Sequence, residues 1–475
     1  MPMPALYARG YWRLCRCIMT TKRKRFHFIY SFKYIKYALL LCLVPMIQAL
    51  LAWDWDSLLG AIRQDIVILL AAAGVVFCLW CVTSFWFEAG RLYVRHGIIT
   101  RRHDVFVPGS ITALVIERPL HCRVLGASKV TLYFRANLYP RSFTLYLSKK
   151  DGAAAAQALL PCEQGASVFR PAGTDRLAFI MLSANALTSA AFAVLCVKNI
   201  SELLGQNWQD FALEHFMTLE NVAARVLPAG AAFVATLLFL IITFTLGHSF
   251  VRCVGFKVRR AGDVLLVQGG LITKVERRIA VADITVCDVH VTPVARLLRR
   301  YPVYLTAGSY NGTDAPVLAY KPGQEHLAAE LLPRFTMPGI PYCNPTHKSL
   351  GQYLWLPAAV FCLTAVLYCA AIPRMPDILP VLFVPLLLSL YAILTAVRGY
   401  RSEGMGRNFN GTLNICYART FTLHYLCVLT TDVTLCLKAS PIAKDEGRCN
   451  AYACTPCHTF RTRGIDVAEV NKLIF

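Results

Sequence analysis

The residues best suited to chemistry in this sequence lie near its end, in the segment Cys454-Thr455-Pro456-Cys457-His458. The spacing CxxCH is the pattern of c-type haem attachment. Haem is attached outside the cytoplasmic membrane, whereas the topology deduced below places this segment inside the cell. The two cysteines also fall where a strand is expected. Haem binding is therefore the less favoured interpretation.

A metal is the second chemistry that this region could support. Adding Cys449 gives four soft ligands within ten residues, Cys449, Cys454, Cys457 and His458. Zinc accepts such ligands, but its structural sites usually divide into two separated pairs. A metal- or haem-binding redox protein or sensor stays open as an alternative, and unpaired cytosolic thiols are the simpler interpretation.

Signatures of enzymes are missing from the sequence. It contains no phosphate-binding GxxxxGK[ST], no GxSxG and no HExxH, and its carboxylates form no plausible acid–base pair. We therefore expect no catalytic residues, no cofactor and no enzymatic activity.

The composition indicates a membrane protein. Of 475 residues, 56% are hydrophobic and only 16% are charged, whereas a soluble domain carries about 25% charged residues. The 19 cysteines are scattered through apolar runs, so they do not suggest a secreted disulfide scaffold. The chain is expected to be polytopic, with substantial mass outside the membrane.

Six stretches are long and apolar enough to cross a bilayer, which takes about 20 helical residues. They are residues 37–53, 66–87, 177–197, 226–251, 353–372 and 378–397. Their interiors contain essentially no ionisable residue, which argues against a transporter, the third alternative.

The charges between these stretches indicate on which side of the membrane each connecting segment lies. Residues 1–36 hold nine Lys or Arg and no acidic residue, and the links inside the three pairs of spans (54–65, 198–225, 373–377) together hold eight acidic and four basic residues. Cytoplasmic segments are the basic ones. We therefore expect a multi-pass protein of the cell membrane with both termini in the cytoplasm. Its net charge of +22 then reflects topology, and no nucleic-acid partner is expected.

The large segments that follow the pairs of spans resemble one another. Residues 88–176 and 252–350 align without a gap at an offset of 173 over their first halves, so that Arg123-Val124-Leu125 matches Arg296-Leu297-Leu298. Strand-like runs such as Phe143–Leu147 are followed by closing helices at 153–160, 325–332 and 467–474. The expected organisation is an internal repeat of a membrane hairpin and a small antiparallel β domain, divided as follows: 1–36 basic cytoplasmic segment, 37–87 hairpin, 88–176 domain, 177–251 hairpin, 252–350 domain, 351–397 hairpin, 398–475 divergent domain.

Residues 90–134 carry a resemblance to a known family. Their pattern of strand, Gly turn, basic strand, and an apolar–Arg–x–x–Gly segment from Leu120 to Gly126 is similar to the bacterial PH-like domain of YdbS/YdbT-type membrane proteins. The order of three hairpins and three domains resembles a YdbT-like member. This resemblance implies PH-like folds, each a bent antiparallel sheet capped by a C-terminal helix, and no catalytic residues.

Basic residues cluster on the expected first hairpins of the first two domains, just below the bilayer. They are Arg91, Arg95, Arg101, Arg102, Lys274, Arg277 and Arg278. Each such residue can gain about 1 kcal/mol from anionic headgroups. Contact with anionic lipid is expected, although positive-inside topology alone would also require these charges.

The expected function is that of a non-enzymatic integral membrane scaffold that presents PH-like domains at the cytoplasmic face for protein assembly, anionic-lipid contact or both. The resemblance further implies a part in envelope maintenance or in tolerance to membrane-active agents. The expected partners are further copies of the chain or a second membrane protein with a PH-like domain.

Overall fold

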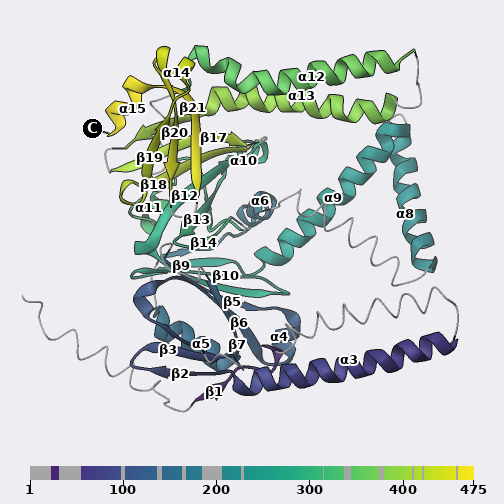
Figure 1. The fold of residues 1–475 in the computed structure, drawn as a ribbon, viewed down its shortest axis with the longest axis vertical. Helices are drawn as coiled ribbons and strands as arrows, with labels where there is room; N and C mark the ends of the chain where they lie inside the picture. Colours follow the sequence, from purple (N-terminus) through teal and green to yellow (C-terminus); the bar gives the residue numbers. More distant parts are fainter. Residues whose placement is uncertain are drawn as a thin grey trace, which may run out of the picture.

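The structure is a computed structural model of the chain. It describes residues 23–30, 55–97, 102–135, 142–162, 167–183, 206–225, 229–313, 315–335, 344–373, 379–408, 411–419, 422–455 and 458–474. These residues form antiparallel β layers from which long helices extend to one side (Figure 1).

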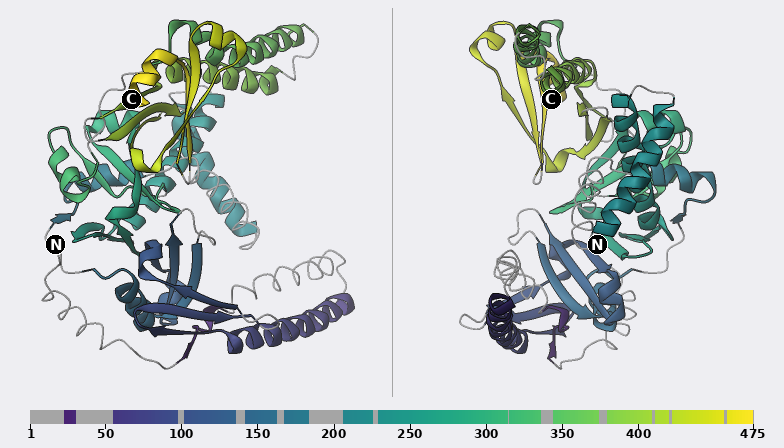
Figure 2. Two further views of the ribbon diagram at one scale, coloured as in Figure 1. Left: turned by 60° about the vertical axis from the view of Figure 1, so that its left-hand side comes forward. Right: turned by 90° about the vertical axis from the view of Figure 1, so that its right-hand side faces the viewer.

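The long helices are α3, α8, α9, α12 and α13 (Trp55–Val82, Gln206–Ala224, Ala229–Cys253, Leu350–Ala371 and Leu379–Ser402). Within the described residues, two stretches are long and apolar enough to cross a membrane, Asp65–Val82 and Leu350–Ala371, and a shorter apolar stretch covers Phe239–Cys253 in α9. The axes of α3, α12 and α13 run roughly parallel: the right-hand view of Figure 2 shows all three nearly end on.

The expected spans at 66–87 and 353–372 therefore correspond to apolar helices, but the end of the first was misplaced. Helix α3 stops at Val82 and residues Ser84–Glu88 form strand β2, because the alternation of Phe85, Trp86 and Phe87 buries every second side chain. The expected span at 37–53 and most of 177–197 lie outside the described residues. Helices α9 and α13 cover residues 229–251 and 379–397 of the expected spans 226–251 and 378–397. Within the described residues neither helix meets the same test of length and hydropathy.

One order of elements occurs in three β segments of the chain. Three strands are followed by a 3-10 turn, a strand, a short helix, further strands and a closing helix. The first segment contains β2 (Ser84–Glu88), β3 (Arg91–His96), β4 (Arg102–Phe106), η1 (Pro108–Ser110), β5 (Ile111–Arg118), α4 (Leu120–Val124), β6 (Ala127–Phe134), β7 (Ser142–Ser148) and α5 (Lys149–Leu159).

The middle segment contains β9 (Lys257–Ala261), β10 (Val264–Gly269), β11 (Lys274–Ala280), η2 (Val281–Asp283), β12 (Ile284–Val291), α10 (Pro293–Leu298), β13 (Tyr301–Ala307), β14 (Tyr310–Asn311), β15 (Leu318–Tyr320) and α11 (Glu325–Leu331). The last segment contains β16 (Gly404–Arg407), β17 (Thr412–Arg419), β18 (Thr422–Leu429), η5 (Thr430–Asp432), β19 (Thr434–Lys438), α14 (Pro441–Asp445), β20 (Arg448–Cys454), β21 (Thr459–Asp466) and α15 (Val467–Ile474).

The sheets join neighbouring segments edge to edge. One seven-stranded sheet has the order β7-β6-β5-β11-β10-β9-β8, so the first segment is continuous with the middle one through the pair β5–β11. A second sheet joins the middle and last segments through the pair β12–β18. We call these two pairs the first seam and the second seam. Two short strands from outside the segments also take part, since β1 (Lys24–Arg25) pairs with β2 and β8 (Ser167–Phe169) pairs with β9.

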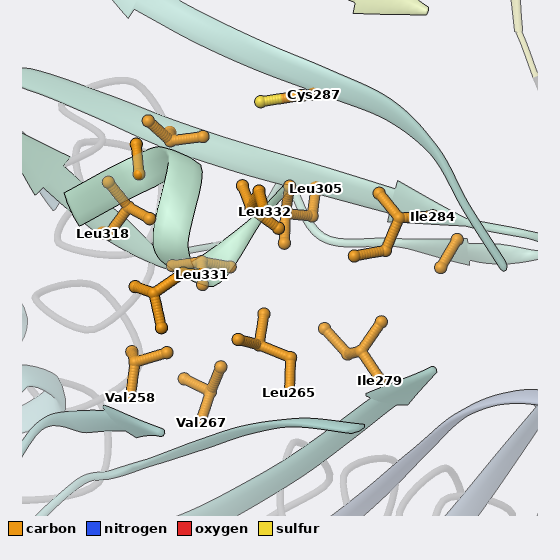
Figure 3. Packing of buried hydrophobic residues seen from close by; sticks show 14 of the residues in the cluster. Val258, Leu265, Val267, Ile279, Ile284, Cys287, Leu305, Leu318, Leu331 and Leu332 are labelled. Carbon is orange, nitrogen blue, oxygen red and sulfur yellow. The ribbon is translucent and has the colours of Figure 1, made fainter. Parts of the chain in front are cut away.

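Each β segment has its own apolar core between two sheets. In the middle segment, Leu265 and Ile279 from one sheet face Ile284 and Leu305 from the other, and Leu331 of α11 fills the space between them (Figure 3). Burial of one such leucine contributes roughly 1.5–3 kcal/mol. Helix α6 (Thr174–Ser183) contains the start of the span expected at 177–197, and it packs Phe179 and Ile180 into the same core.

The direction of the strands sets which loops lie near the long helices. Strands β2, β9 and β16 begin within four residues of the ends of α3, α9 and α13. Because successive strands are antiparallel, the end of β3, the start of β4, the β10–β11 connection and helices α4 and α10 lie at this same end. We call it the helix-side end of the β layers. In Figure 1, α4 and α10 lie on the side from which the long helices extend.

Candidate functional site

The connection between β10 and β11 closes the end of helix α9. The backbone N–H of Gly270 donates to the carbonyl of Val254 over 2.9 Å, and that of Leu271 donates to the carbonyl of Val251 over 2.9 Å. These bonds satisfy carbonyls that the helix end leaves free. Gly270 has a φ of 99°, and a Cβ there would lie 2.0 Å from the carbonyl oxygen of Thr273, so only glycine fits this turn.

The turn carries apolar side chains that point away from the protein. Leu271 and Ile272 are 51% and 52% exposed beside the end of α9. Helix α4 lies next to them, because the guanidinium of Arg123 donates to the carbonyl of Leu271 over 2.9 Å. Leu120 and Val124 of α4 are exposed as well. Exposed apolar side chains gathered in this way indicate a contact surface for a membrane or a partner.

Helix α10 presents the same kind of surface at the second seam. The side chain of Leu297 is 84% exposed, and Val294 on the same helix is also exposed. Ala295 anchors the helix in the core, and the Thr292 hydroxyl accepts a hydrogen bond from its N–H at 3.0 Å. Arg296 and Arg299 flank the exposed leucine.

A basic cavity of about 330 Å³ lies beside the β10–β11 connection. It is lined by Arg118, Lys257 and Lys274, and Glu276 is the only acidic side chain among its lining residues. Lys274 lies directly opposite Arg118 across the first seam, so their charges face the same side of the sheet. Three cations around one small cavity favour an anion such as a phosphate group.

The predicted lipid-contact residues of the first segment occupy different places. Arg95 and Arg102 lie at the helix-side end, because Arg95 pairs with Ser84 and Arg102 with His96. Arg91 lies at the other end of β3, opposite Glu88. Arg101 lies outside the described residues.

The predicted lipid-contact residues of the middle segment also have different surroundings. Lys274 is exposed and lines the basic cavity. Arg277 lines a neighbouring cavity of about 280 Å³ together with Arg252. Arg278 is occupied within the protein, since it pairs with Glu276 at 3.0 Å and donates to the carbonyl of Leu160 at the end of α5 over 2.9 Å.

Of the candidate cysteine ligands near the C-terminus, the two that the structure describes, Cys449 and Cys454, do not converge on one ion. Cys449 and Cys454 lie in the same strand, β20, five residues apart, which corresponds to about 16 Å. Cys449 is buried, and its burial raises the pKa of the thiol, which makes it a poorer ligand. Cys454 is the last residue of β20, His458 directly precedes β21, and Cys457 lies outside the described residues. Cys449 is therefore not part of any site that contains Cys454.

A different cluster crosses the second seam. Oδ2 of Asp288 lies 2.8 Å from Nε2 of His290 and 3.0 Å from Nδ1 of His424. Each imidazole stacks on a tyrosine, His290 on Tyr304 and His424 on Tyr417. Among the described residues, these three are the group whose ligand atoms lie close enough to hold a metal ion.

The geometry of this cluster is that of a hydrogen-bonded clamp, because one carboxylate oxygen is shared by two imidazoles. Burial alone would raise the pKa of Asp288, but the hydrogen bonds from the two histidines outweigh burial and lower it below the ordinary value. The clamp joins β12 of the middle segment to β18 of the last segment.

A family comparison identifies the central part of the chain. Residues 216–333 match the family described as Bacterial PH domain. The chain contains a PH-like domain. The match covers α9 and the middle β segment, and the bent antiparallel layers closed by α11 agree with it. Comparisons with curated proteins and with solved structures gave no match.

Sequence reasoning missed the exposed apolar side chains of this PH-like domain and of α4. The signal was present in short runs that combine leucine or valine with arginine, as in Leu120–Val124 and in Leu297–Arg300. The clamp gave no such signal, because His290 and His424 are 134 residues apart in the chain.

Proposed function

We propose that this protein is a non-enzymatic membrane scaffold whose β layers rest on an anionic bilayer through their helix-side end. The proposal rests on three features that lie at one end of the layers: the apolar helices, the exposed apolar side chains of the β10–β11 connection, α4 and α10, and the basic cavity. These apolar side chains enter the bilayer surface, while Arg118, Lys257 and Lys274 hold lipid phosphate.

The family match supports this use of the fold, since PH domains often contact lipids. We further propose that all three β segments are PH-like repeats of the YdbT-like kind, because they share one order of elements. The chain then crosses the cell membrane several times with the β layers in the cytoplasm, where the basic residues favour them.

Titration with soluble lipids tests the lipid contact. The full-length protein in detergent is titrated with short-chain phosphatidylglycerol and, separately, with short-chain phosphatidylcholine, and the dissociation constants are compared. The anionic lipid is expected to bind more tightly. Lys274→Glu is expected to weaken binding of phosphatidylglycerol by about tenfold. Loss of one juxtamembrane charge removes about 1 kcal/mol, which is roughly fivefold in affinity, and reversal of the charge adds repulsion.

Arg91→Glu is the matched control, since it reverses an exposed charge at the opposite end of the layers. Its affinity for phosphatidylglycerol should equal that of the unchanged protein. Equal affinity for the two lipids, or an equal loss in the two variants, would contradict lipid contact at the helix-side end.

A further inference from the structure

The two seams are built in the same way. In each, the strand that follows the 3-10 turn of one segment pairs antiparallel with the third strand of the next segment. Strand β5 accepts β11, and strand β12 accepts β18. The chain therefore uses one kind of strand pairing twice to join consecutive segments.

The register of the two seams is also the same. In the first seam Ala113, the third residue after η1, lies opposite Ile279, the second residue before η2. In the second seam Val286, the third residue after η2, lies opposite Val428, the second residue before η5. Two junctions with one register indicate a repeated interface that the local structure of each segment specifies.

Within the part of the chain that the structure describes, two strands of these kinds remain at open sheet edges: one that follows a 3-10 turn, and one that is the third strand of its segment. Strand β19 follows η5 as β5 follows η1, and among the described residues it pairs only with β20. Strand β4 is the third strand of the first segment, and within the same residues it pairs only with β3. Side chains of β5 and β12 are mostly buried, whereas four of the five in β19 are exposed. An open edge of this kind is a template for another strand.

We propose that β19 of one copy of this chain pairs with β4 of a second copy, so that the protein assembles head to tail through a third seam. This assembly deepens the proposed scaffold function and rests on it, because that proposal places all copies in one membrane with the same orientation. The occupant is a second copy because the chain carries both halves of the junction, one at each end of its row of segments. Such a heterologous contact generates a ring or an open row of molecules.

The shared register fixes which residues meet. Leu435, the third residue after η5, lies opposite Phe106, the second residue before η1, of the other copy. Cys436 then lies opposite Val105. These two positions correspond to Cys287 and Cys427 of the second seam, which are buried opposite each other. In the single chain, by contrast, Cys436 and Val105 are exposed.

Cross-linking tests this register directly. Val105→Cys is introduced into the full-length protein, which retains its native Cys436, and membranes are treated with a short bifunctional maleimide. Side chains directly opposite in antiparallel strands have Cβ atoms about 4.5–5.5 Å apart, so the two thiols are expected to join different copies. The expected product is a ladder of covalent dimers, trimers and longer species.

Two variants control for the other cysteines of the chain. Cys436→Ser in the Val105→Cys background removes one partner and should return cross-linking to the level of the unchanged protein. Leu120→Cys, an exposed position on α4 of the same segment, should not exceed that level. A ladder that persists without Cys436, or no ladder in the Val105→Cys protein, would overturn the third seam.

A charge exchange gives a second readout without cross-linking. Val105→Asp combined with Cys436→Asp places like charges opposite each other, and the assembly is expected to dissociate in detergent solution. Val105→Lys combined with Cys436→Asp should restore it. A size that is the same in all variants would also contradict the inference. Lipid binding by these variants is measured separately, so failure of the seam and failure of lipid contact are distinguishable.

Discussion

Asp288→Ala is expected to open the second seam. The carboxylate accepts hydrogen bonds from His290 and His424, and only 14% of its side chain is exposed. Only the bond to His424 crosses the seam, because His290 lies in β12 together with Asp288. A hydrogen bond to a charged group contributes about 1.5–3 kcal/mol, so its loss should lower the free energy of opening by about 2 kcal/mol. Hydrogen exchange of the β12 and β18 amides should accelerate by roughly thirtyfold, since each 1.4 kcal/mol is a factor of ten.

Strand β5 of the first seam supplies a control, an ion pair that lies within the first segment and does not cross the seam. Glu117 of β5 pairs with Lys129 at 2.7 Å, but both side chains are 35% exposed, and such a pair contributes about 1 kcal/mol or less. Glu117→Ala should leave exchange in β5 and β11 nearly unchanged. Equal effects in the two seams would show that Asp288 does not act as a clamp.

The pH dependence of the second seam follows from the lowered pKa of Asp288. A carboxyl whose pKa is lower in the folded state stabilises that state fully above its unfolded pKa, and the contribution is lost as the pH falls through the folded pKa. Protection of β12 and β18 is therefore expected to persist at mildly acidic pH and to fall at lower pH. In the Asp288→Ala protein this acidic transition should be absent.

Glu403→Ala is expected to detach the last β segment from its helices. The hydroxyl of Tyr353 in α12 donates to Oε2 of Glu403 over 2.5 Å, and the N–H of Arg463 in β21 donates to the same oxygen over 3.2 Å. Glu403 is buried and directly follows α13. The carboxylate thus joins α12, α13 and β21. Its removal takes this acceptor from the N–H of Arg463 and leaves the Tyr353 hydroxyl with only the longer contact to the carbonyl of Arg463, at 3.3 Å. We expect a loss of about 2–4 kcal/mol in stability, measured as a lower midpoint of thermal unfolding in detergent.

Glu403→Gln separates hydrogen bonding from charge. The amide oxygen of glutamine can accept both hydrogen bonds, so the midpoint should stay close to that of the unchanged protein. Burial raises the pKa of Glu403, and a carboxyl with a raised pKa destabilises the folded state as the pH rises through that range. The glutamine variant should lose this dependence. A midpoint as low as that of the alanine variant would contradict the joining role.

Local elements were predictable because their causes are local. The expected strand at 143–147 lies within β7, and helices end the three segments near the expected positions, at Lys149–Leu159, Glu325–Leu331 and Val467–Ile474. Amphipathic spacing and turn residues report such elements wherever they occur. The end of α3 was misjudged because Phe85 and Phe87 are apolar whether they belong to a helix or to a strand.

Pairing between segments was not predictable in the same way. Strand β5 is apolar without a break from Ile111 to Ile116, apart from Thr112, which is typical of a strand with neighbours on both sides. That pattern does not identify β11, which lies more than 150 residues further along the chain, as the neighbour. The clamp was unpredictable for the same reason, since only the pairing of β12 with β18 brings Asp288 and His424 together.

The depth of Leu297 tests the central claim, that the helix-side end of the β layers rests on an anionic membrane. Leu297→Cys is labelled with an environment-sensitive fluorophore in the reconstituted protein, and quenching by nitroxide-bearing lipids is compared between vesicles of phosphatidylglycerol with phosphatidylcholine and vesicles of phosphatidylcholine alone. Val107→Cys, exposed just after β4 at the opposite end of the layers, is the control. We expect strong quenching at 297 that increases with the anionic lipid and none above background at 107. Equal quenching at the two positions, or none at 297 in either membrane, would contradict the proposed orientation.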